Sequence, residues 1–442
     1  MRSVNKPLIE GSILHHLVRL SIPASMGMIF NTLYNLSDFW FAGRVSDEAL
    51  AGVSIAGSVF FLLLALGIGI QTGASAIIAP AVGKSDNDEV ANWVDHVFGL
   101  AILLSILVTA LGWWVAEPLV VFLGAEPDIA PLAMEYVTIT LLGASTFILS
   151  FAAAGALMAM GDTKSNRNAL AAGFFINLAL NPLLTFALEL GVSGLALATV
   201  LIKAGSAVYL YWVLCREIGR YSKPKISINR WLDLLKQVLP ASFNMLTIIL
   251  GSFITISLIG RFGSEHVAGY AVGLRLEQVL LLPALGLNAA VMAIAGQNLG
   301  AGHYKRVHET YKTALIVGLA MAAVSIPIMV FLSPAMMDFF TDDQSIRDTG
   351  AAYLKIDAIA FYAYVVLFLS TATLQAMKQP MFPMVLGIAR QLVIPASINY
   401  WLITQVNSPM MTVFYTIISV VVVAAFVAHW YTSRQLKELT SS

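Results

Sequence analysis

Four polar side chains recur at helical spacing in an apolar stretch near the start of the chain. Residues 21–44 read SIPASMGMIFNTLYNLSDFWFAGR, with polar groups at i, i+3, i+4 and i+7: Asn31, Tyr34, Asn35 and Asp38. These four positions share one face of a helix. An ionised acid at membrane depth costs roughly 2.5–3.5 kcal/mol on insertion scales, so such acids mark ion or substrate pathways. The face therefore predicts a substrate cleft in which Asp38 binds a proton or a cation.

Two amides on a later helix are candidate partners for Asp38. Asn177 and Asn181 lie four residues apart, and Pro182 follows directly. Because proline frees a carbonyl one turn earlier, near Leu178, these amides lie beside an irregular backbone. Asparagines in helix bundles often only bond neighbouring helices. Since a buried acid needs polar partners, we favour an ion-coupling role.

Three further residues extend this site. Thr199 and Tyr136 each supply a hydroxyl for the network, although a buried threonine usually bonds its own helix. Pro23 lies fifteen residues before Asp38 and is either a first-turn residue or the point where the helix bends. We expect a bend at Pro23 and a coupling site formed by Asp38, Asn177, Asn181, Thr199 and Tyr136.

Several other charged residues fall in or near apolar segments: Lys203, Arg275, Glu277, Lys355, Asp357 and Arg390. Most have an opposite charge nearby in the sequence, or lie near an interface where a long side chain reaches water. Asp357 is the rival candidate for a proton site.

The composition is that of a polytopic membrane protein. Of 442 residues, 58% are hydrophobic and 11% charged, whereas soluble domains carry about 25% charged residues; the mean hydropathy is +0.81. The net charge of zero and the lack of a basic face argue against a nucleic-acid partner. Cys215 is the one cysteine, which excludes an internal disulfide and a thiolate metal site.

Twelve apolar segments are long enough to span a bilayer, and such long runs favour helices over a barrel. They cover residues 12–41, 50–80, 92–117, 131–160, 166–188, 192–215, 233–260, 268–299, 309–333, 349–377, 382–404 and 410–433. With the amino terminus inside, eighteen Lys and Arg residues face the cytoplasm and three face outward. This bias predicts that both termini are cytoplasmic. We expect no cleaved signal, because the first apolar run is long.

The two halves of the chain repeat one design. A shift of 217 residues places Pro23-Ala24-Ser25 on Pro240-Ala241-Ser242, Gly69 on Gly286, and Asp38 on Thr255. Six helices per half with both ends inside indicate parallel repeats. We therefore predict an amino-terminal lobe over residues 1–215, a cytoplasmic linker over 216–236 and a carboxyl-terminal lobe over 237–442. The acid belongs to the first lobe alone.

Motifs of catalysis are missing from the sequence. It contains no HExxH, no GxSxG and no Walker loop, and an intramembrane enzyme would need a nucleophile, a metal motif or a paired acid. We expect a transporter with no cofactor and no bound metal, driven by an ion gradient.

Several motifs together give the chain a resemblance to a known family. AMGDTK at 159–164, NLALNP at 177–182 and GQNLGAG at 296–302 follow Pro23 and Asp38 in order. The chain thereby resembles the multidrug and toxic compound extrusion (MATE) transporters along essentially its whole length, and looks like their DinF-like branch. There the first-helix aspartate is associated with proton coupling. Two departures stand out: Asn181 replaces an aspartate of some relatives, and Ile248 and Tyr364 stand near the positions where the NorM-like branch carries acids.

The resemblance implies a twelve-helix protein with the MATE, or MOP-type, fold in a bacterial inner membrane. It implies a monomer that exports hydrophobic or cationic drugs in exchange for protons and contacts membrane lipid. Two alternatives stay open. One is a sodium-coupled exporter that uses the same oxygens, and the other is a flippase for a lipid-linked precursor.

Overall fold

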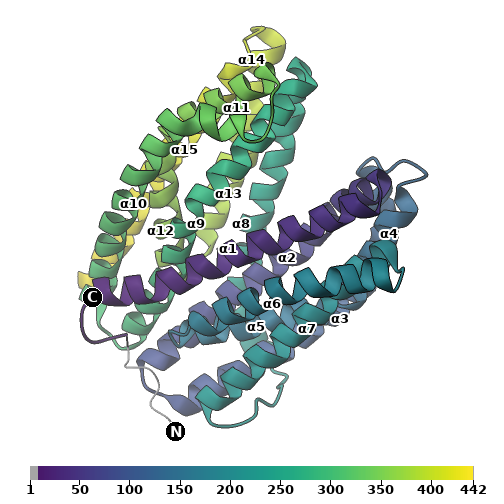
Figure 1. The fold of residues 1–442 in the computed structure, drawn as a ribbon. Helices are drawn as coiled ribbons and strands as arrows, with labels where there is room; N and C mark the ends of the chain where they lie inside the picture. The colour runs from purple at the N-terminus through teal and green to yellow at the C-terminus, as the bar shows by residue number, and fades with distance from the viewer. Residues whose placement is uncertain (1–7, 442) are drawn as a thin grey trace. The chain divides into compact units, whose positions relative to one another are not determined.

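The protein is a bundle of long helices. The computed structural model describes residues 8–441, and no strand occurs between them. Ten helical segments in this range are long and apolar enough to cross a membrane, and two bent helix pairs bring the total to twelve. The prediction of twelve spanning segments is therefore confirmed. Figure 1 shows the long helices that form them.

The spanning segments are as follows. The first six are α1 (Ile13–Val45), α2 (Asp47–Gly83), α3 (Asn87–Phe122), α4 (Ala130–Leu142) with α5 (Ala144–Ala159), α6 (Lys164–Pro182) with η1 (Leu183–Ala187), and α7 (Gly191–Ile218). The second six are α8 (Ile228–Ile259) with η2 (Gly260–Phe262), α9 (Ser264–Gly300), α10 (Tyr304–Asp338), α11 (Gln344–Asp357) with α12 (Phe361–Ala376), α13 (Met381–Ile388) with η3 (Ala389–Val393) and α14 (Ile394–Gln405), and α15 (Met411–Ser441).

Polar caps extend α2 and α3 beyond the starts of their apolar runs. Ser46 precedes α2 and its hydroxyl accepts a hydrogen bond from the amide of Ala49 at 3.0 Å. Asp86 caps α3 in the same way through Glu89. Caps satisfy the free amides of a first turn, which hydrophobicity does not register.

The connection between α7 and α8 covers residues 219–227, well within the expected 216–236.

Two spans are broken at equivalent points of the repeat. The α4–α5 pair bends by 51° and the α11–α12 pair by 58°. The first break lies at Gly143 and the second includes Ala360, which coincide under the shift of 217 residues. Gly143 packs so closely on Val200 that an added Cβ would lie 2.5 Å from it. The apolar segments 131–160 and 349–377 give no sign of these breaks in the sequence.

The chain divides into two compact units. One comprises residues 1–10 and 26–242, and the other comprises 11–25 and 243–442. The divisions after Ser25 and after Ser242 coincide under the repeat shift. In this division the start of α1, up to Ser25, belongs to the second unit, and the start of α8, up to Ser242, belongs to the first. The lobe boundaries proposed from the sequence stay a prediction.

In each unit, one of two glycines matched by the repeat allows two helices to pack closely together. A Cβ on Gly69 of α2 would lie 1.9 Å from the Ser242 hydroxyl of α8, and a Cβ on Gly286 of α9 would lie 2.0 Å from the Ser25 hydroxyl of α1. Only glycine allows backbones to approach so closely in a membrane bundle. These contacts hold the proline-containing first half of α1 against α9 and that of α8 against α2.

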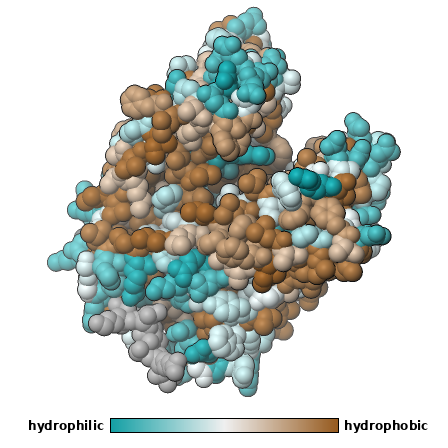
Figure 2. Space-filling model, viewed as in Figure 1, coloured by the Kyte–Doolittle hydropathy of each residue, from teal (hydrophilic) through white to brown (hydrophobic). Residues whose placement is uncertain are grey.

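Apolar side chains form the interior and much of the surface. The first unit has a core of Ala, Val, Leu and Phe residues that extends from α2 and α3 to Leu234 and Val238 of α8. A smaller core in the second unit joins α12 to α15. Figure 2 shows apolar residues over much of the visible face, with hydrophilic residues gathered toward the helix ends. This distribution suits a bundle surrounded by lipid.

Candidate functional site

Asp38 is buried within the first unit and held by three helices. Its side chain lies on α1, and only 7% of the residue is exposed. The Asn177 amide of α6 donates to Asp38 Oδ1 at 2.7 Å, and the Asn181 amide donates to the same oxygen at 2.8 Å. Residues 139 and 143 positions apart in sequence thus meet at one carboxylate.

Hydroxyl groups complete the other side of the carboxylate. Thr199 of α7 donates to Asp38 Oδ2 at 3.3 Å and accepts from the Tyr34 hydroxyl at 3.0 Å. Tyr136 of α4 interacts with Thr199 and with the charge of Asp38. All are at least nine-tenths buried. The polar residues expected to form a coupling site are therefore brought together, while their role in coupling stays a prediction.

A cation also lies beside this cluster. The Lys203 ammonium of α7 is 5.7 Å from the centre of the Tyr34 ring and interacts electrostatically with Asp38. Lys203 follows Thr199 by four residues, so both side chains share one face of α7. Lys203 is one of the charges within the apolar segments, and the sequence alone gave no partner for it. Its four-residue spacing from Thr199 is the signal that associates it with the Asp38 site.

The shape of α6 explains why both asparagines point inward. Buried residues recur at every fourth position of this helix: Ser165, Ala169, Gly173, Asn177 and Asn181. After Pro182 the backbone widens into the π-helical turn η1, a form frequent at functional sites. The sequence predicted an irregular backbone beside the two asparagines, with a free carbonyl near Leu178. The π-helical turn follows Pro182 directly, and the free carbonyl stays a prediction.

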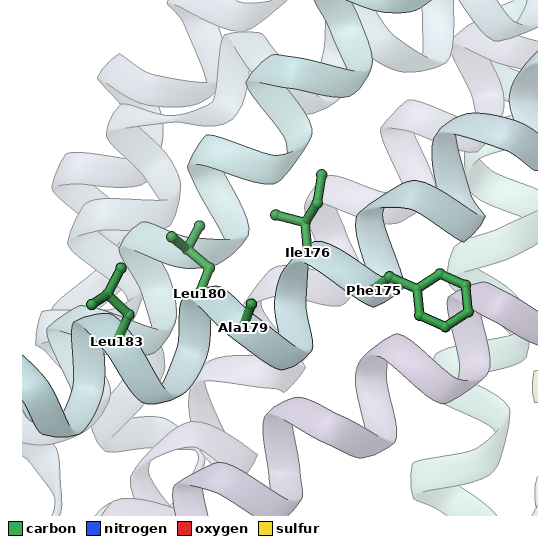
Figure 3. Close-up of a pocket in the computed structure, with 5 residues that line it drawn as sticks. All are labelled: Phe175, Ile176, Ala179, Leu180 and Leu183. Carbon is green, nitrogen blue, oxygen red and sulfur yellow. The ribbon is translucent and has the colours of Figure 1, made fainter.

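The outer face of α6 carries a shallow apolar hollow that is separate from this cluster. It holds about 330 Å³ and is lined by Phe175, Ile176, Ala179, Leu180 and Leu183. Figure 3 shows these side chains along one side of α6 and η1. The buried asparagines lie on the opposite side of the same helix. The hollow offers no polar group to orient a ligand, so we assign it no role.

The other residues predicted on α1 lie outside the network. Asn35 is exposed and Asn31 half-buried, whereas Tyr34 is buried with Asp38. The four-residue face is thus divided, with Tyr34 and Asp38 turned into the unit. Pro23 lies inside α1, which continues as one helix from Ile13 to Val45. The substrate contacts of Asn31 and Asn35 and the bend at Pro23 stay predictions.

The cluster contains one oxygen that is available to accept a hydrogen bond from a protonated Asp38. An ionised Asp38 accepts three hydrogen bonds, and bonds to a charged group are roughly twice as strong as neutral ones. Asn181 Oδ1 is buried and has no hydrogen-bond partner among residues 8–441. A protonated Asp38 needs an acceptor for its O–H. Rotation about the Asn181 side chain supplies one, so the cluster can accommodate both states of the carboxyl.

A second buried acid of this unit serves a structural purpose. Asp95 of α3 is fully buried and accepts from Arg220 at 2.8 Å, from the Lys223 amide at 2.9 Å and from Ser222 at 3.0 Å. Lys225 lies 3.3 Å from its Oδ2. The carboxylate raises the pKa of Arg220, which lies in the connection between α7 and α8. Asp95 thus fastens this connection to α3, a role that sequence analysis missed.

Comparison with known proteins identifies the family. The model of the MatE family matches residues 23–183 and 240–401, one block in each half of the repeat. The chain belongs to the MatE family. The MatE proteins are membrane transporters, so this chain is a multi-pass transporter and not an enzyme.

Curated relatives agree along most of the chain. An FAD transporter of Shewanella oneidensis is 27% identical over 397 residues, covering 87% of this chain and 86% of that protein. The multidrug export protein MepA of Staphylococcus aureus is 24% identical over 388 residues, covering 86% and 85%.

Solved structures show the same MatE fold. An outward-facing multidrug resistance MATE transporter of the MOP superfamily has a TM-score of 0.91 at 24% identity and covers 99% of both chains. A MOP superfamily transporter from Pyrococcus furiosus has a TM-score of 0.92 at 24% identity. The match covers 100% of this chain and 99% of that chain. The all-helical fold with twelve membrane segments, predicted from the sequence, is thereby confirmed.

Proposed function

We propose that this MatE transporter exports amphipathic, often cationic compounds in exchange for protons, and that Asp38 is the coupling carboxyl. The observation that carries the proposal is the set of contacts of Asp38, which joins α1 to α6 and α7 through three hydrogen bonds. Relatives described as multidrug exporters, MepA among them, support the class of substrate. The protein works in a bacterial inner membrane with both termini cytoplasmic, as a monomer.

The coupling step follows from the difference between the two states of Asp38. When ionised, the carboxylate attracts the amide hydrogens of Asn177 and Asn181 and holds α1 against α6. When a proton binds, these bonds lose their charge assistance, and Asn181 Oδ1 becomes the acceptor of the new O–H. Proton binding therefore favours a different position of α1. Pro23, which lacks an amide hydrogen, lets the helix bend there, and the bend expels substrate from the face that carries Asn31 and Asn35.

The hydrogen bonds of Asp38 support protons over sodium. Three donors already occupy its carboxylate, and a sodium ion bound there would have to replace them with oxygen ligands. A sodium-coupled exporter would thus need all three partners to rearrange, whereas a proton needs only the rotation of Asn181. A flippase for a lipid-linked precursor would need basic residues to bind phosphate, and the Asp38 cluster contains Lys203 alone.

Imposed gradients test this proposal. The purified protein is reconstituted in proteoliposomes with a fluorescent cationic drug, and a proton gradient and a sodium gradient are applied separately. We expect the proton gradient to drive drug transport and the sodium gradient to have no effect. Transport that follows sodium alone would contradict the proposal.

A second substrate class is favoured by one observation. Lys203 places a positive charge beside Tyr34 and Asp38, and the Shewanella oneidensis relative is described as an FAD transporter. An anionic dinucleotide fits an ammonium group better than a cationic drug does. Competition in the same liposomes decides between them: excess FAD inhibits drug transport only if both bind. A Lys203→Gln variant should lose that inhibition and keep drug transport.

A further inference from the structure

Two acids of the second unit are buried without a basic partner. Glu277 on α9 is 4% exposed and Asp357 on α11 is fully buried. Arg275 and Lys355 are their basic neighbours in sequence, but neither acid forms an ion pair within residues 8–441. Isolated buried carboxylates are costly, so their charge has to be removed in another way.

Tyrosine hydroxyls surround both carboxyl groups. Tyr353 of α11 donates to Glu277, and Tyr364 of α12 donates to Asp357 Oδ1 at 3.2 Å. Tyr270 of α9 packs edge-on against Tyr353, with ring centres 4.9 Å apart. Close approach of the helices holds this arrangement, since a Cβ on Gly273 would lie 2.7 Å from the Tyr353 ring. We call Glu277, Asp357 and these three tyrosines the acid–tyrosine cluster.

The acid–tyrosine cluster lies in a region of negative electrostatic potential. The two carboxyl groups interact electrostatically with each other, and Asp357 is the last residue of α11, where the helix dipole adds negative potential. Asp357 Oδ2 is buried and has no hydrogen-bond partner in the described chain. Arg390 of η3 interacts with Tyr364 but forms no ion pair with either acid among these residues. Two negative charges here would repel each other, and no ion pair within the described residues offsets them.

The repeat places this cluster where the Asp38 site lies in the first unit. Tyr353 is the counterpart of Tyr136 under the shift of 217 residues, and Thr255 is the counterpart of Asp38. Thr255 in turn interacts with Tyr270. The second unit thus has Thr255 in place of an acid at this position of α8 but provides two acids around it, from α9 and α11.

We propose that Glu277 and Asp357 form a second proton-binding site, in which at least one of the two carboxyl groups carries a proton. Asp357 Oδ2, which has no hydrogen-bond partner in the described chain, is the oxygen that holds it. Both tyrosine hydroxyls already donate to the acids, so they leave no open cage for a metal cation, which prefers several oxygen ligands. Because Asp357 ends α11 at the 58° break before α12, loss of the proton would place like charges at this bend.

Infrared spectroscopy of the purified full-length protein tests the site. The Asp38→Asn background removes the coupling carboxyl, so a stretching band from a protonated carboxyl at neutral pH then reports on the remaining acids. We expect this band in Asp38→Asn and its loss when Glu277→Gln and Asp357→Asn are added. Asp338→Asn, at an exposed ion pair with Arg347, is the control that leaves the band unchanged. Absence of the band in Asp38→Asn, or its persistence in the triple variant, overturns the proposal.

A second measurement covers failure of the triple variant to fold. Asp357→Asn alone resembles the protonated acid and still accepts from Tyr364, so we expect a thermal unfolding temperature no lower than that of the wild type at neutral pH. A marked loss of stability would show that the charge itself is required and would overturn the proposal. Replacing choline chloride by sodium chloride should leave the wild-type band in place, and its disappearance would identify a sodium site instead. None of these outcomes depends on whether Asp38 couples transport.

Discussion

Replacement of Asp38 by asparagine removes the charge and almost nothing else. The new amide has the shape of a protonated carboxyl, and its oxygen accepts from Asn177 and Asn181 as Asp38 Oδ1 does at 2.7 and 2.8 Å. Its NH₂ group then faces Thr199, which accepts instead of donating. The fold of the first unit should therefore persist, while the variant is confined to the neutral state of the network.

The size of the effect follows from three hydrogen bonds. A bond to a charged group contributes about 1.5–3 kcal/mol and a neutral bond about 0.5–1.5 kcal/mol, so each loses about 1 kcal/mol when Asp38 is neutral. Three such bonds amount to about 3 kcal/mol, which corresponds to a factor of roughly 100 in an equilibrium constant. A proton can shift α1 between two positions by that factor, and Asp38→Asn cannot shift at all. We expect proton-driven transport to fall roughly 100-fold.

The assay follows drug and protons together in proteoliposomes. Drug efflux under a proton gradient is recorded with a fluorescent substrate, and proton release on drug addition is recorded with a pH dye. Binding of drug to the detergent-solubilised variant should stay within a few-fold of the wild type. Asp233→Asn, an exposed acid paired with Lys236, serves as the matched control and should behave as the wild type. An Asp38→Asn protein with wild-type efflux and proton release would refute the reasoning.

Three other substitutions probe the architecture. Thr199→Val removes two hydrogen bonds at constant shape and should lower efflux about tenfold, with drug binding as the check that the site persists. Gly286→Ala places a methyl 2.0 Å from a side chain of α1 and should cost about 1–3 kcal/mol of stability. Gly57→Ala, with nothing within 4 Å, should cost none, and equal melting of the two would contradict the packing argument. Asp95→Asn loses charged bonds to the connection after α7 and should speed its tryptic cleavage about tenfold, whereas Asp233→Asn should not.

The sequence by itself determined the twelve spans and the repeat. Apolar runs of more than twenty residues have no alternative to helices in lipid, because each backbone group has to be satisfied within its own segment. Asp38 and its amide partners were visible for the same reason, since a polar group in such a run is expensive and therefore rare. The repeat carried further information, because it matched Gly69 with Gly286 before any contact was known. The breaks within the fourth and tenth spans escaped prediction, as hydropathy does not depend on helix direction.

Only the tertiary structure decided which polar groups meet. Helical spacing placed Asn31 and Asn35 beside Tyr34 and Asp38, yet packing turned two of the four inward and left Asn35 exposed. Contacts between helices more than a hundred residues apart depend on how side chains interlock, and no local pattern records that. The same holds for Glu277 and Asp357, which have basic neighbours in sequence. Packing of α9 on α11 brings Glu277 to Tyr353, and Asp357 meets Tyr364 of α12 across the break between α11 and α12. The charges next to the two acids in the chain give no sign of either contact.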